Sequence, residues 1–476
     1  MGRDRHPDGV RVDPATPDDL ATFAEAQRQI GRMQAPLLHD AAKPDSRLFV
    51  MAFDGTGNDK DAEPREDWTN VALLHEQVRE ARRRNPSVAT GYVPGPGTQD
   101  AAVPKLLDQI TGYTFQARVE QGYHQFTEQA LAWLKQNPGA EVSVAAVGFS
   151  RGAEQAAAFT RLVHERGIQN PEGAIVERNP AGEITGVTYT LPPLVPPTQV
   201  KQAIVSFDPV GTGQPMDHDR RLPPSVMGGL QISALHEQRD QFRSTEAMSP
   251  GLSPDRRFLQ VWVAGAHSNI GGSYSANGLS DRSFNLATEY LNHLSDRPLF
   301  TKRPESLDPA MNVIHRSHEH QWVYTQRGFR DGQRDVVQQL APPSACRPVP
   351  ALCHDREPQD AALAATVTWR DVRLTPNPVA GTPGTRDAPT PIWQQTPSTP
   401  RSAADEVDAL FDRLSAAAMA GDQTGMRAAS RDYVRLDSGQ AWRASGRQAD
   451  PEPTPSHAPT AEPAPTVAIE TTGPRR

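Results

Sequence analysis

Between residues 45 and 330 the hydrophobic positions form short continuous apolar runs, separated by stretches with helical periodicity. A continuous apolar run of this length is typical of a strand that is buried on both faces of a parallel sheet. The first helical stretch begins at Thr16-Pro17, a favourable N-cap followed by proline at the first helical position. The pattern predicts strands at 48–53, 141–147, 202–207 and 258–264, and helices at 16–33, 69–84, 116–136 and 153–165.

Strands that alternate with helices indicate an α/β fold, here a mostly parallel central sheet flanked by helices. We expect residues 1–44 to form an N-terminal extension with one helix and residues 45–373 to form the main domain. The composition then changes. The Pro-rich stretch 374–400 predicts a linker, residues 401–448 regain helical periodicity, and residues 449–476 have the composition of a disordered tail.

Charge and composition exclude several classes of protein. The net charge is −8 and the basic residues are scattered, so nothing indicates a nucleic-acid partner. The sequence contains no run of 18 apolar residues, so it predicts no membrane-spanning helix. The first residues, MGRDRHPDGV, lack the apolar segment of a signal peptide, so we expect a protein made in the cytoplasm without one. Cys346 and Cys353 are expected to be free thiols rather than a disulfide.

Each predicted strand ends in a polar, glycine-rich turn, the arrangement of an active-site rim in an open parallel sheet. The second of these turns, Gly148-Phe149-Ser150-Arg151-Gly152, matches the G-x-S-x-G nucleophile elbow of α/β-hydrolases. A buried strand precedes the motif and an Ala-rich helix follows it, which is the context that the motif requires. Ser150 is therefore the predicted nucleophile, and a coincidental turn is the alternative.

A serine nucleophile needs a base, and the base needs an orienting acid. Asp208 and His267 follow successive predicted strands, in the chain order of this fold. The alternatives are a turn aspartate that caps its own backbone before Pro209, and a histidine that is merely packed at a strand end. His315 is a rival base, because it also follows a short apolar stretch.

The tetrahedral intermediate of acyl transfer needs hydrogen-bond donors. The elbow assigns one to the backbone N–H of Arg151, and the early loop at Gly55-Thr56 is expected to supply another. A phosphate site at this early loop would need a P-loop with its lysine or a Gly-rich fingerprint leading into a helix. The sequence has neither motif here, so a nucleotide enzyme is disfavoured.

No metal or cofactor is expected. His236-Glu237 lacks the second histidine of a zinc motif and is interpreted as a solvated helix face. The run His315, His318, His320 is interpreted as polar surface, because no matching cysteine or acidic partner accompanies it.

Six motifs now occur in an order typical of one family: FDGTGN at 53–58, TNV at 69–71, GFSRGA at 148–153, FDPVGT at 207–212, ALHEQRDQF at 234–242 and VWVAGAHSNIGGSY at 261–274. Across residues 48–330 the chain resembles the α/β-hydrolase domain of bacterial type VI secretion phospholipase effectors. The resemblance implies an antibacterial effector that is exported into a rival cell and cleaves an acyl ester of glycerophospholipids. It further implies three partners: the target membrane as substrate, an immunity protein, and a secretion-machine adaptor.

The resemblance carries the roles of nucleophile, acid and base onto Ser150, Asp208 and His267. One departure is Asn269, which stands where the family usually has aspartate. If that position held the triad acid, with His315 as its base, this chain would have an amide in place of a carboxylate. Asn269 favours one alternative, a non-catalytic hydrolase-like binding protein. A soluble carboxylesterase, which would differ only in pocket and lid, is a second alternative, and the C-terminal segment leaves export by a type IV machine as a third. Residues 213–255 are interpreted either as a lid or as a loop that decorates the sheet.

Overall fold

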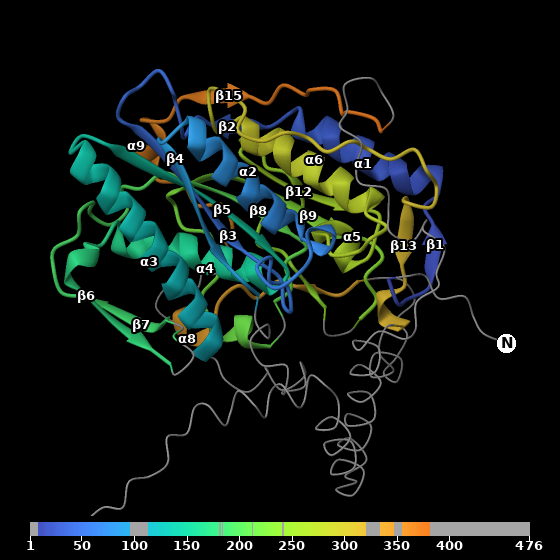
Figure 1. The fold of residues 1–476 in the computed structure, drawn as a ribbon, viewed down its shortest axis with the longest axis horizontal. Coiled ribbons are helices and arrows are strands. Elements are labelled where there is room, and N and C mark those ends of the chain that lie inside the picture. The colour runs from blue at the N-terminus through green and yellow to red at the C-terminus, as the bar shows by residue number, and fades with distance from the viewer. Residues whose placement is uncertain are drawn as a thin grey trace, which may run out of the picture. The chain divides into compact units, whose positions relative to one another are not determined.

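A seven-stranded sheet with strand order β11-β12-β9-β8-β5-β3-β4 forms the centre of the molecule (Figure 1). The computed structural model describes residues 8–95, 113–179, 182, 184–211, 213–239, 242–319, 334–346 and 355–380. Six strands are parallel, and the short edge strand β11 is antiparallel to its neighbour β12. The α/β-hydrolase-like fold class predicted from the sequence is confirmed. The strands are β3 (Ser46–Phe53), β4 (Val88–Val93), β5 (Glu141–Phe149), β8 (Gln202–Phe207), β9 (Val226–Ala234), β11 (Gly251–Leu252) and β12 (Phe258–Val263).

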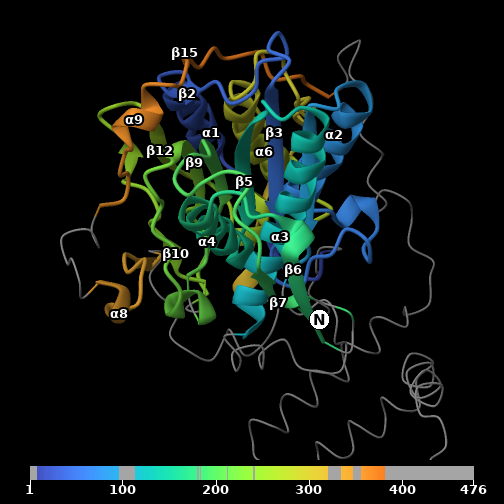
Figure 2. The ribbon, with the colours of Figure 1, turned by 90° about the vertical axis from the view of Figure 1, so that its left-hand side faces the viewer.

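Helices cover both faces of this sheet (Figures 1 and 2). One face packs against α1 (Pro17–Ile30), α2 (Asn70–Arg84) and α6 (Gly278–Asn292), and the other against α3 (Tyr113–Gln136) and α4 (Arg151–Arg166). Successive side chains of a strand point to opposite faces, so a strand in the middle of the sheet must be apolar throughout. In β3, Leu48, Val50 and Ala52 join the first cluster, and Phe49, Met51 and Phe53 join the second.

Local signals set the helix starts as the sequence predicted. Thr16 Oγ1 accepts a hydrogen bond from the N–H of Asp19 at 3.1 Å, and the Asp19 carboxylate accepts one from the N–H of Thr16 at 2.8 Å. This reciprocal pair is a capping box. Thr69 caps α2 by accepting from the N–H of Ala72 at 3.1 Å. These caps satisfy N–H groups that have no partner within the helix.

The prediction that residues 213–255 form a lid or a decorating loop is wrong for their central part. Residues 226–234 form β9, a fully buried strand between β8 and β12. Its sequence, VMGGLQISA, contains two glycines, and these weaken the strand signal. Gly228 needs to be small, because an added Cβ would lie 2.8 Å from the backbone carbonyl oxygen of Arg257.

Smaller elements surround the sheet. The pairs are β1 (Val12–Pro14) with β13 (Val313–His315), β2 (Gln34–Pro36) with β15 (Trp369–Asp371), β6 (Ala174–Arg178) with β7 (Ile184–Tyr189), and β10 (Ser244–Thr245) with β14 (Val336–Val337). The short helices are α5 (His267–Gly271), α8 (Pro343–Cys346) and α9 (Ala361–Ala364), with 3₁₀ turns at Arg65–Asp67, Pro171–Gly173, Gln214–Asp217 and Ser317–Glu319.

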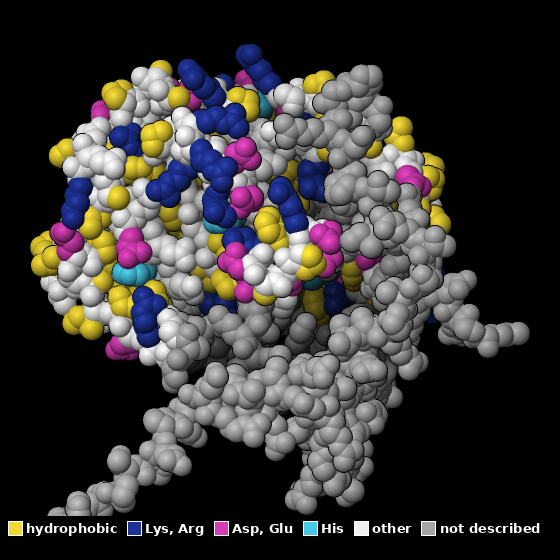
Figure 3. All heavy atoms as spheres, viewed as in Figure 1, with side chains coloured by type: hydrophobic (Ala, Val, Ile, Leu, Met, Phe, Trp, Pro, Cys, Tyr) yellow, Lys and Arg dark blue, Asp and Glu magenta, His cyan; other side chains and the backbone are white. Residues whose placement is uncertain are grey.

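Cys346 is disulfide-bonded, so the expectation of free thiols is wrong. A disulfide is characteristic of proteins that work outside a reducing cytoplasm. Cys353 lies outside the described residues, as do the predicted helical segment 401–448 and tail 449–476. On the face seen in Figure 3, Lys and Arg side chains are interspersed with Asp and Glu. None of the helices within the described ranges has the length and apolar character needed to cross a bilayer.

Candidate functional site

The predicted nucleophile, acid and base all stand at the carboxyl ends of strands in the central sheet. Ser150 follows β5, Asp208 follows the neighbouring strand β8, and His267 lies four residues after β12. The backbone N–H of Ser150 donates to the carbonyl of Phe207 at 3.0 Å, which fixes the turn after β5 against the end of β8. Parallel strands bring such ends to one edge, where active sites of open α/β sheets form.

Ser150 has the backbone geometry of a nucleophile elbow. Its φ is 58° and its ψ is −128°, an unfavourable conformation for a residue with a side chain. The flanking glycines make the turn possible. A Cβ at Gly148 would lie 2.4 Å from the Gly152 carbonyl oxygen, and a Cβ at Gly152 would lie 2.4 Å from the carbonyl oxygens of Phe53 and Asp54. The sharp turn therefore presses β5, α4 and the end of β3 together.

We predict that Gly152→Ala destabilises the protein by about 1–3 kcal/mol, because its added methyl group collides with rigid backbone. Chemical denaturation measures the change in the free energy of unfolding. The matched control is Gly139→Ala, since a Cβ at Gly139 would only approach the Asn137 side chain, at 3.4 Å. Equal stability of the two variants would contradict the tight packing of the elbow.

His267 and Asp208 form a buried hydrogen-bonded pair. His267 Nδ1 donates to Asp208 Oδ2 at 2.5 Å, and both side chains are almost fully enclosed. The His267 ring packs against Phe149, the residue before Ser150, with ring centroids 4.5 Å apart. No hydrogen bond joins Ser150 Oγ to His267 within the described residues; such contacts often tighten only when substrate binds.

The surroundings set the charges of this pair. Burial lowers the pKa of His267, and the hydrogen bond and charge of Asp208 offset part of this effect. Burial alone would raise the pKa of Asp208, but the positive charge of Arg334 and the hydrogen bond from His267 outweigh it and lower the pKa. The pair is therefore poised as a neutral imidazole beside an ionised carboxylate, the state that a general base and its orienting acid require.

A second carboxylate, Glu237, lies beside His267. Glu237 Oε2 accepts from the backbone N–H of His267 at 3.2 Å and pairs with Arg239 at 2.9 Å. Burial opposes the charge of Glu237, yet Arg239 holds the pKa of this carboxyl well below its usual range. The Arg239 guanidinium in turn lies 3.4 Å from the centre of the Phe242 ring, whose edge meets His267. The interpretation of His236-Glu237 as a solvated helix face is thus wrong.

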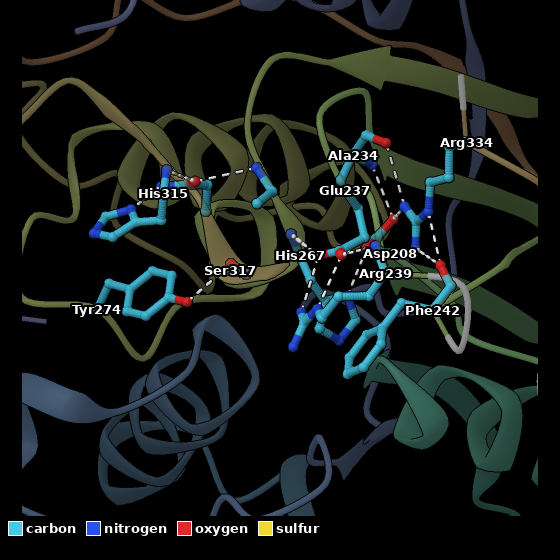
Figure 4. Close-up of polar contacts among 12 residues, drawn as sticks. Asp208, Ala234, Glu237, Arg239, Phe242, His267, Tyr274, His315, Ser317 and Arg334 are labelled. Carbon is cyan, nitrogen blue, oxygen red and sulfur yellow. Dashed lines mark hydrogen bonds and ion pairs between the residues drawn. The ribbon is translucent and has the colours of Figure 1, made fainter. Parts of the chain in front are cut away.

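Arg334 is the positively charged partner of Asp208 (Figure 4). It donates to Asp208 Oδ1, to the carbonyl of Ala234 at 3.2 Å, and to the carbonyl of Phe242 at 2.9 and 2.7 Å. Sequence reasoning missed this residue, because it lies 126 positions from Asp208 and belongs to no motif.

His315, the rival base, belongs to a different cluster. Asn269 Nδ2 donates to His315 Nδ1 at 2.8 Å, so the other ring nitrogen carries the proton and donates to Asp8 Oδ2 at 2.8 Å. Tyr274 stacks on the imidazole with centroids 3.8 Å apart. Figure 4 shows this cluster apart from Asp208. Because both ring nitrogens of His315 are occupied, the geometry favours His267 as the base.

The histidine run is not polar surface as expected. His315 and His318 are buried, and His320 lies outside the described residues. Asn269 uses its amide fully: Oδ1 accepts from the N–H groups of Ala266 and His315, and Nδ2 also donates to the carbonyl of Val313. An ionised aspartate at this position could not donate to the Val313 carbonyl or to His315 Nδ1, as Asn269 Nδ2 does. Asn269 therefore has a structural explanation that leaves the Asp208–His267 pair intact.

The early loop lies against the elbow. Arg151 Nε donates to Thr56 Oγ1 at 2.6 Å, which ties the start of α4 to this loop. The N–H of Gly55 donates to Asp54 Oδ1 at 2.7 Å and is thus engaged within its own turn. The N–H of Thr56 donates to none of the residues that the structure describes. Of the donors predicted in this loop, Thr56 is the one available to a substrate oxyanion.

The buried Asp54 carboxylate holds the early loop in place through hydrogen bonds. It accepts from Thr69 Oγ1 at 2.8 Å, from the Tyr92 hydroxyl at 2.7 Å and from Gly55. Burial nevertheless raises the pKa of Asp54 to about 6, from an ordinary value of 3.8, because these hydrogen bonds offset desolvation only in part.

A pH dependence of stability follows. Since the folded pKa of Asp54 exceeds the unfolded one, the folded protein binds an extra proton between pH 4 and 6, and this contribution to stability is lost as pH rises through about 6. Asp54→Asn removes the titration. We predict that the free energy of unfolding of the wild type, relative to this variant, falls by about 2–3 kcal/mol from pH 4 to pH 7. Chemical denaturation of the wild type and of Asp54→Asn at pH 4 and pH 7 measures this difference. If the free energies of unfolding of the two proteins changed equally with pH, the raised pKa of Asp54 would be contradicted.

No cluster of three or more His, Cys, Asp or Glu side chains in the described part of the chain is arranged to hold a metal ion. The site itself offers a strained serine, a neutral histidine beside an ionised aspartate, and backbone N–H groups near them.

Two stretches of the chain, 47–178 and 197–299, match the model of the catalytic domain of T6SS Tle1-like phospholipase effectors. Ser150, Asp208 and His267 lie within these ranges, and Arg334 lies beyond them. No curated protein matches the chain.

Similar solved structures are distant in sequence. One is an uncharacterised protein from Pseudomonas aeruginosa, with 16% sequence identity and a TM-score of 0.38; the match covers 62% of this chain and 51% of that one. Another is a Tle1 effector bound to the VgrG spike of the type 6 secretion system, with 19% identity and a TM-score of 0.28; the match covers 48% of this chain and 51% of that one. A third is a putative α/β-superfamily hydrolase from Xanthomonas campestris, with 14% identity and a TM-score of 0.24; the match covers 51% of this chain and 98% of that one. The chain thus spans about half the length of the first two.

Proposed function

Because the chain belongs to the family of Tle1-like phospholipase effectors of the type VI secretion system, we propose that it is a serine-dependent phospholipase that cleaves an acyl ester of glycerophospholipids. The observation that carries this proposal is the buried Asp208–His267 hydrogen bond, at the same sheet edge as the strained Ser150 turn. A hydrolase-like binding protein would have no use for a strained serine beside a buried acid–base pair.

In the proposed reaction, His267 Nε2 takes the proton of Ser150 Oγ as that oxygen attacks the ester carbonyl. In this proposal the N–H groups of Thr56 and Arg151 receive the developing oxyanion. His267 then protonates the leaving lysophospholipid oxygen, and Asp208 stabilises the imidazolium meanwhile. Water, deprotonated by the same histidine, hydrolyses the acyl-enzyme and releases a fatty acid.

The family also bears on where the protein acts. We propose export by the type VI machine into a rival bacterium, with the target membrane as substrate and an immunity protein that protects the producer. A Tle1 effector binds the VgrG spike, and a spike or adaptor of that machine is the secretion partner we propose here. The disulfide at Cys346 is consistent with work outside the producing cytoplasm.

The test is hydrolysis of mixed phosphatidylethanolamine and phosphatidylglycerol vesicles by the purified full-length chain, with products identified by mass spectrometry. We expect equal amounts of free fatty acid and lysophospholipid. Cleavage of short-chain esters alone would indicate the carboxylesterase alternative. A folded protein that cleaves neither substrate would overturn the proposal in favour of a binding protein.

A further inference from the structure

Arg334 is the feature of the site that the family match does not reach. It follows residue 299, the last matched residue, by 35 positions. Its side chain is 4% exposed, and the side chain of its partner Asp208 is fully buried. All three guanidinium nitrogens donate, to Asp208, Ala234 and Phe242. The guanidinium group is planar and permanently charged. Because all three of its nitrogens donate hydrogen bonds, it is held in one orientation and fixes the orientation of the Asp208 carboxylate.

The two oxygens of Asp208 have separate tasks. Oδ1 accepts from Arg334 and from the backbone N–H of Ala234 at 2.9 Å, whereas Oδ2 accepts from His267. With Oδ1 held from two directions, the carboxylate cannot rotate about its Cβ–Cγ bond. Oδ2 therefore stays aimed at His267 Nδ1, and Nε2 stays directed away from Asp208.

Among the residues that the structure describes, the charges around the Asp208–His267 pair balance only if Arg334 is counted. Two carboxylates, Asp208 and Glu237, and two guanidinium groups, Arg239 and Arg334, surround His267. Among the described residues, Tyr274 is a further titratable group near Arg239 and Glu237, and burial keeps it neutral by raising its pKa. With a neutral imidazole the cluster has no net charge. Removing Arg334 leaves one excess negative charge that a proton on His267 would compensate.

We propose that Arg334 is a positioning residue of the catalytic acid: it locks the Asp208 carboxylate toward His267 and balances its charge, so that His267 is neutral and correctly oriented when Ser150 attacks. The inference rests on the proposed function, since it assigns Asp208 and His267 the roles of acid and base. It adds a residue from outside the matched catalytic domain, supplied by the segment 334–337 that pairs through β14 with β10.

The deciding variant is Arg334→Met, which keeps much of the side-chain volume and removes the charge and the donors. Without the cation, the Asp208 charge stabilises the imidazolium more strongly, so a larger fraction of His267 is protonated at a given pH. The acidic limb of the kcat/KM profile is expected to move up by about half to one pH unit. Loss of orientation should also lower kcat by about 10- to 100-fold with little change in KM.

Two further variants separate positioning from mere folding. Arg334→Lys keeps the charge but not the planar fork, so we expect the acidic limb to stay in place while kcat falls. Arg243→Met is the matched control, because Arg243 forms a half-exposed ion pair with Asp335, the neighbour of Arg334, at 3.6 Å. It should leave both kcat and the pH profile unchanged.

A readout without catalysis makes the test independent of the proposed function. NMR titration of ¹³C-labelled histidine, with His267 assigned through His267→Gln, reports its protonation directly. We expect Arg334→Met to raise the titration midpoint of His267 even if no ester is cleaved, so an inactive wild type would refute only the phospholipase. The inference is overturned if folded Arg334→Met keeps the wild-type midpoint and pH profile. It is equally overturned if Arg334→Met fails to fold and Arg334→Lys has wild-type kcat.

Discussion

Replacing Ser150 with alanine is expected to lower kcat for phospholipid hydrolysis by roughly a million-fold. The reason is that in the proposed mechanism Ser150 Oγ forms the covalent bond of the acyl-enzyme, and the turn 148–152 carries no second hydroxyl. Alanine carries a Cβ as serine does, so the backbone conformation at φ 58° is no worse tolerated and the fold should be retained. Fatty-acid release from vesicles, followed by mass spectrometry over hours, is sensitive enough to measure the loss.

The matched control for this variant is Ser143→Ala. Ser143 is a buried serine near the start of β5, seven positions before Ser150. It should retain wild-type activity. Substantial activity in folded Ser150→Ala would exclude the acyl-enzyme mechanism and point to direct attack by water.

The second large effect is expected from Asp208→Asn, which should lower kcat by about 10⁴-fold. An amide cannot stabilise the imidazolium that forms when His267 takes the serine proton. The amide NH₂ could also donate to His267 Nδ1, which would impose the wrong tautomer. The substitution leaves Arg334 buried without its counter-charge, so a loss of about 3–5 kcal/mol in stability should accompany the loss of activity.

A second buried acid separates these two effects. Asp281 pairs with Arg303 and is enclosed on α6, where the proposed mechanism has no role for it. Asp281→Asn should lower the free energy of unfolding while kcat stays near the wild-type value under folding conditions. A comparable loss of kcat in both variants would show that stability, rather than the acid of the pair, limits activity. Thermal denaturation beside vesicle hydrolysis measures both quantities.

Several elements of the fold could be predicted because their signals are local. From residue 144 to residue 149 the run before Ser150 reads VAAVGF, without a polar side chain, and this is typical of a strand covered on both faces. Thr16 and Thr69 cap their helices through contacts only three residues away. The strand β9 was missed because its glycines resemble a loop, and what they accommodate, such as the Tyr290 hydroxyl 2.8 Å from a Cβ at Gly228, comes from a distant part of the chain.

The sequence by itself determined the elbow, the order of Ser150, Asp208 and His267, and the sheet that brings them to one edge, since spacing and periodicity encode all three. Only the tertiary structure favours His267 over His315 as the proposed base, because the choice depends on which acid each ring nitrogen meets, and Asp8 is 307 residues from His315. It alone placed Glu237 and Arg334 around the pair. Charged side chains can be buried only where partners converge from several elements, and no local pattern records that convergence.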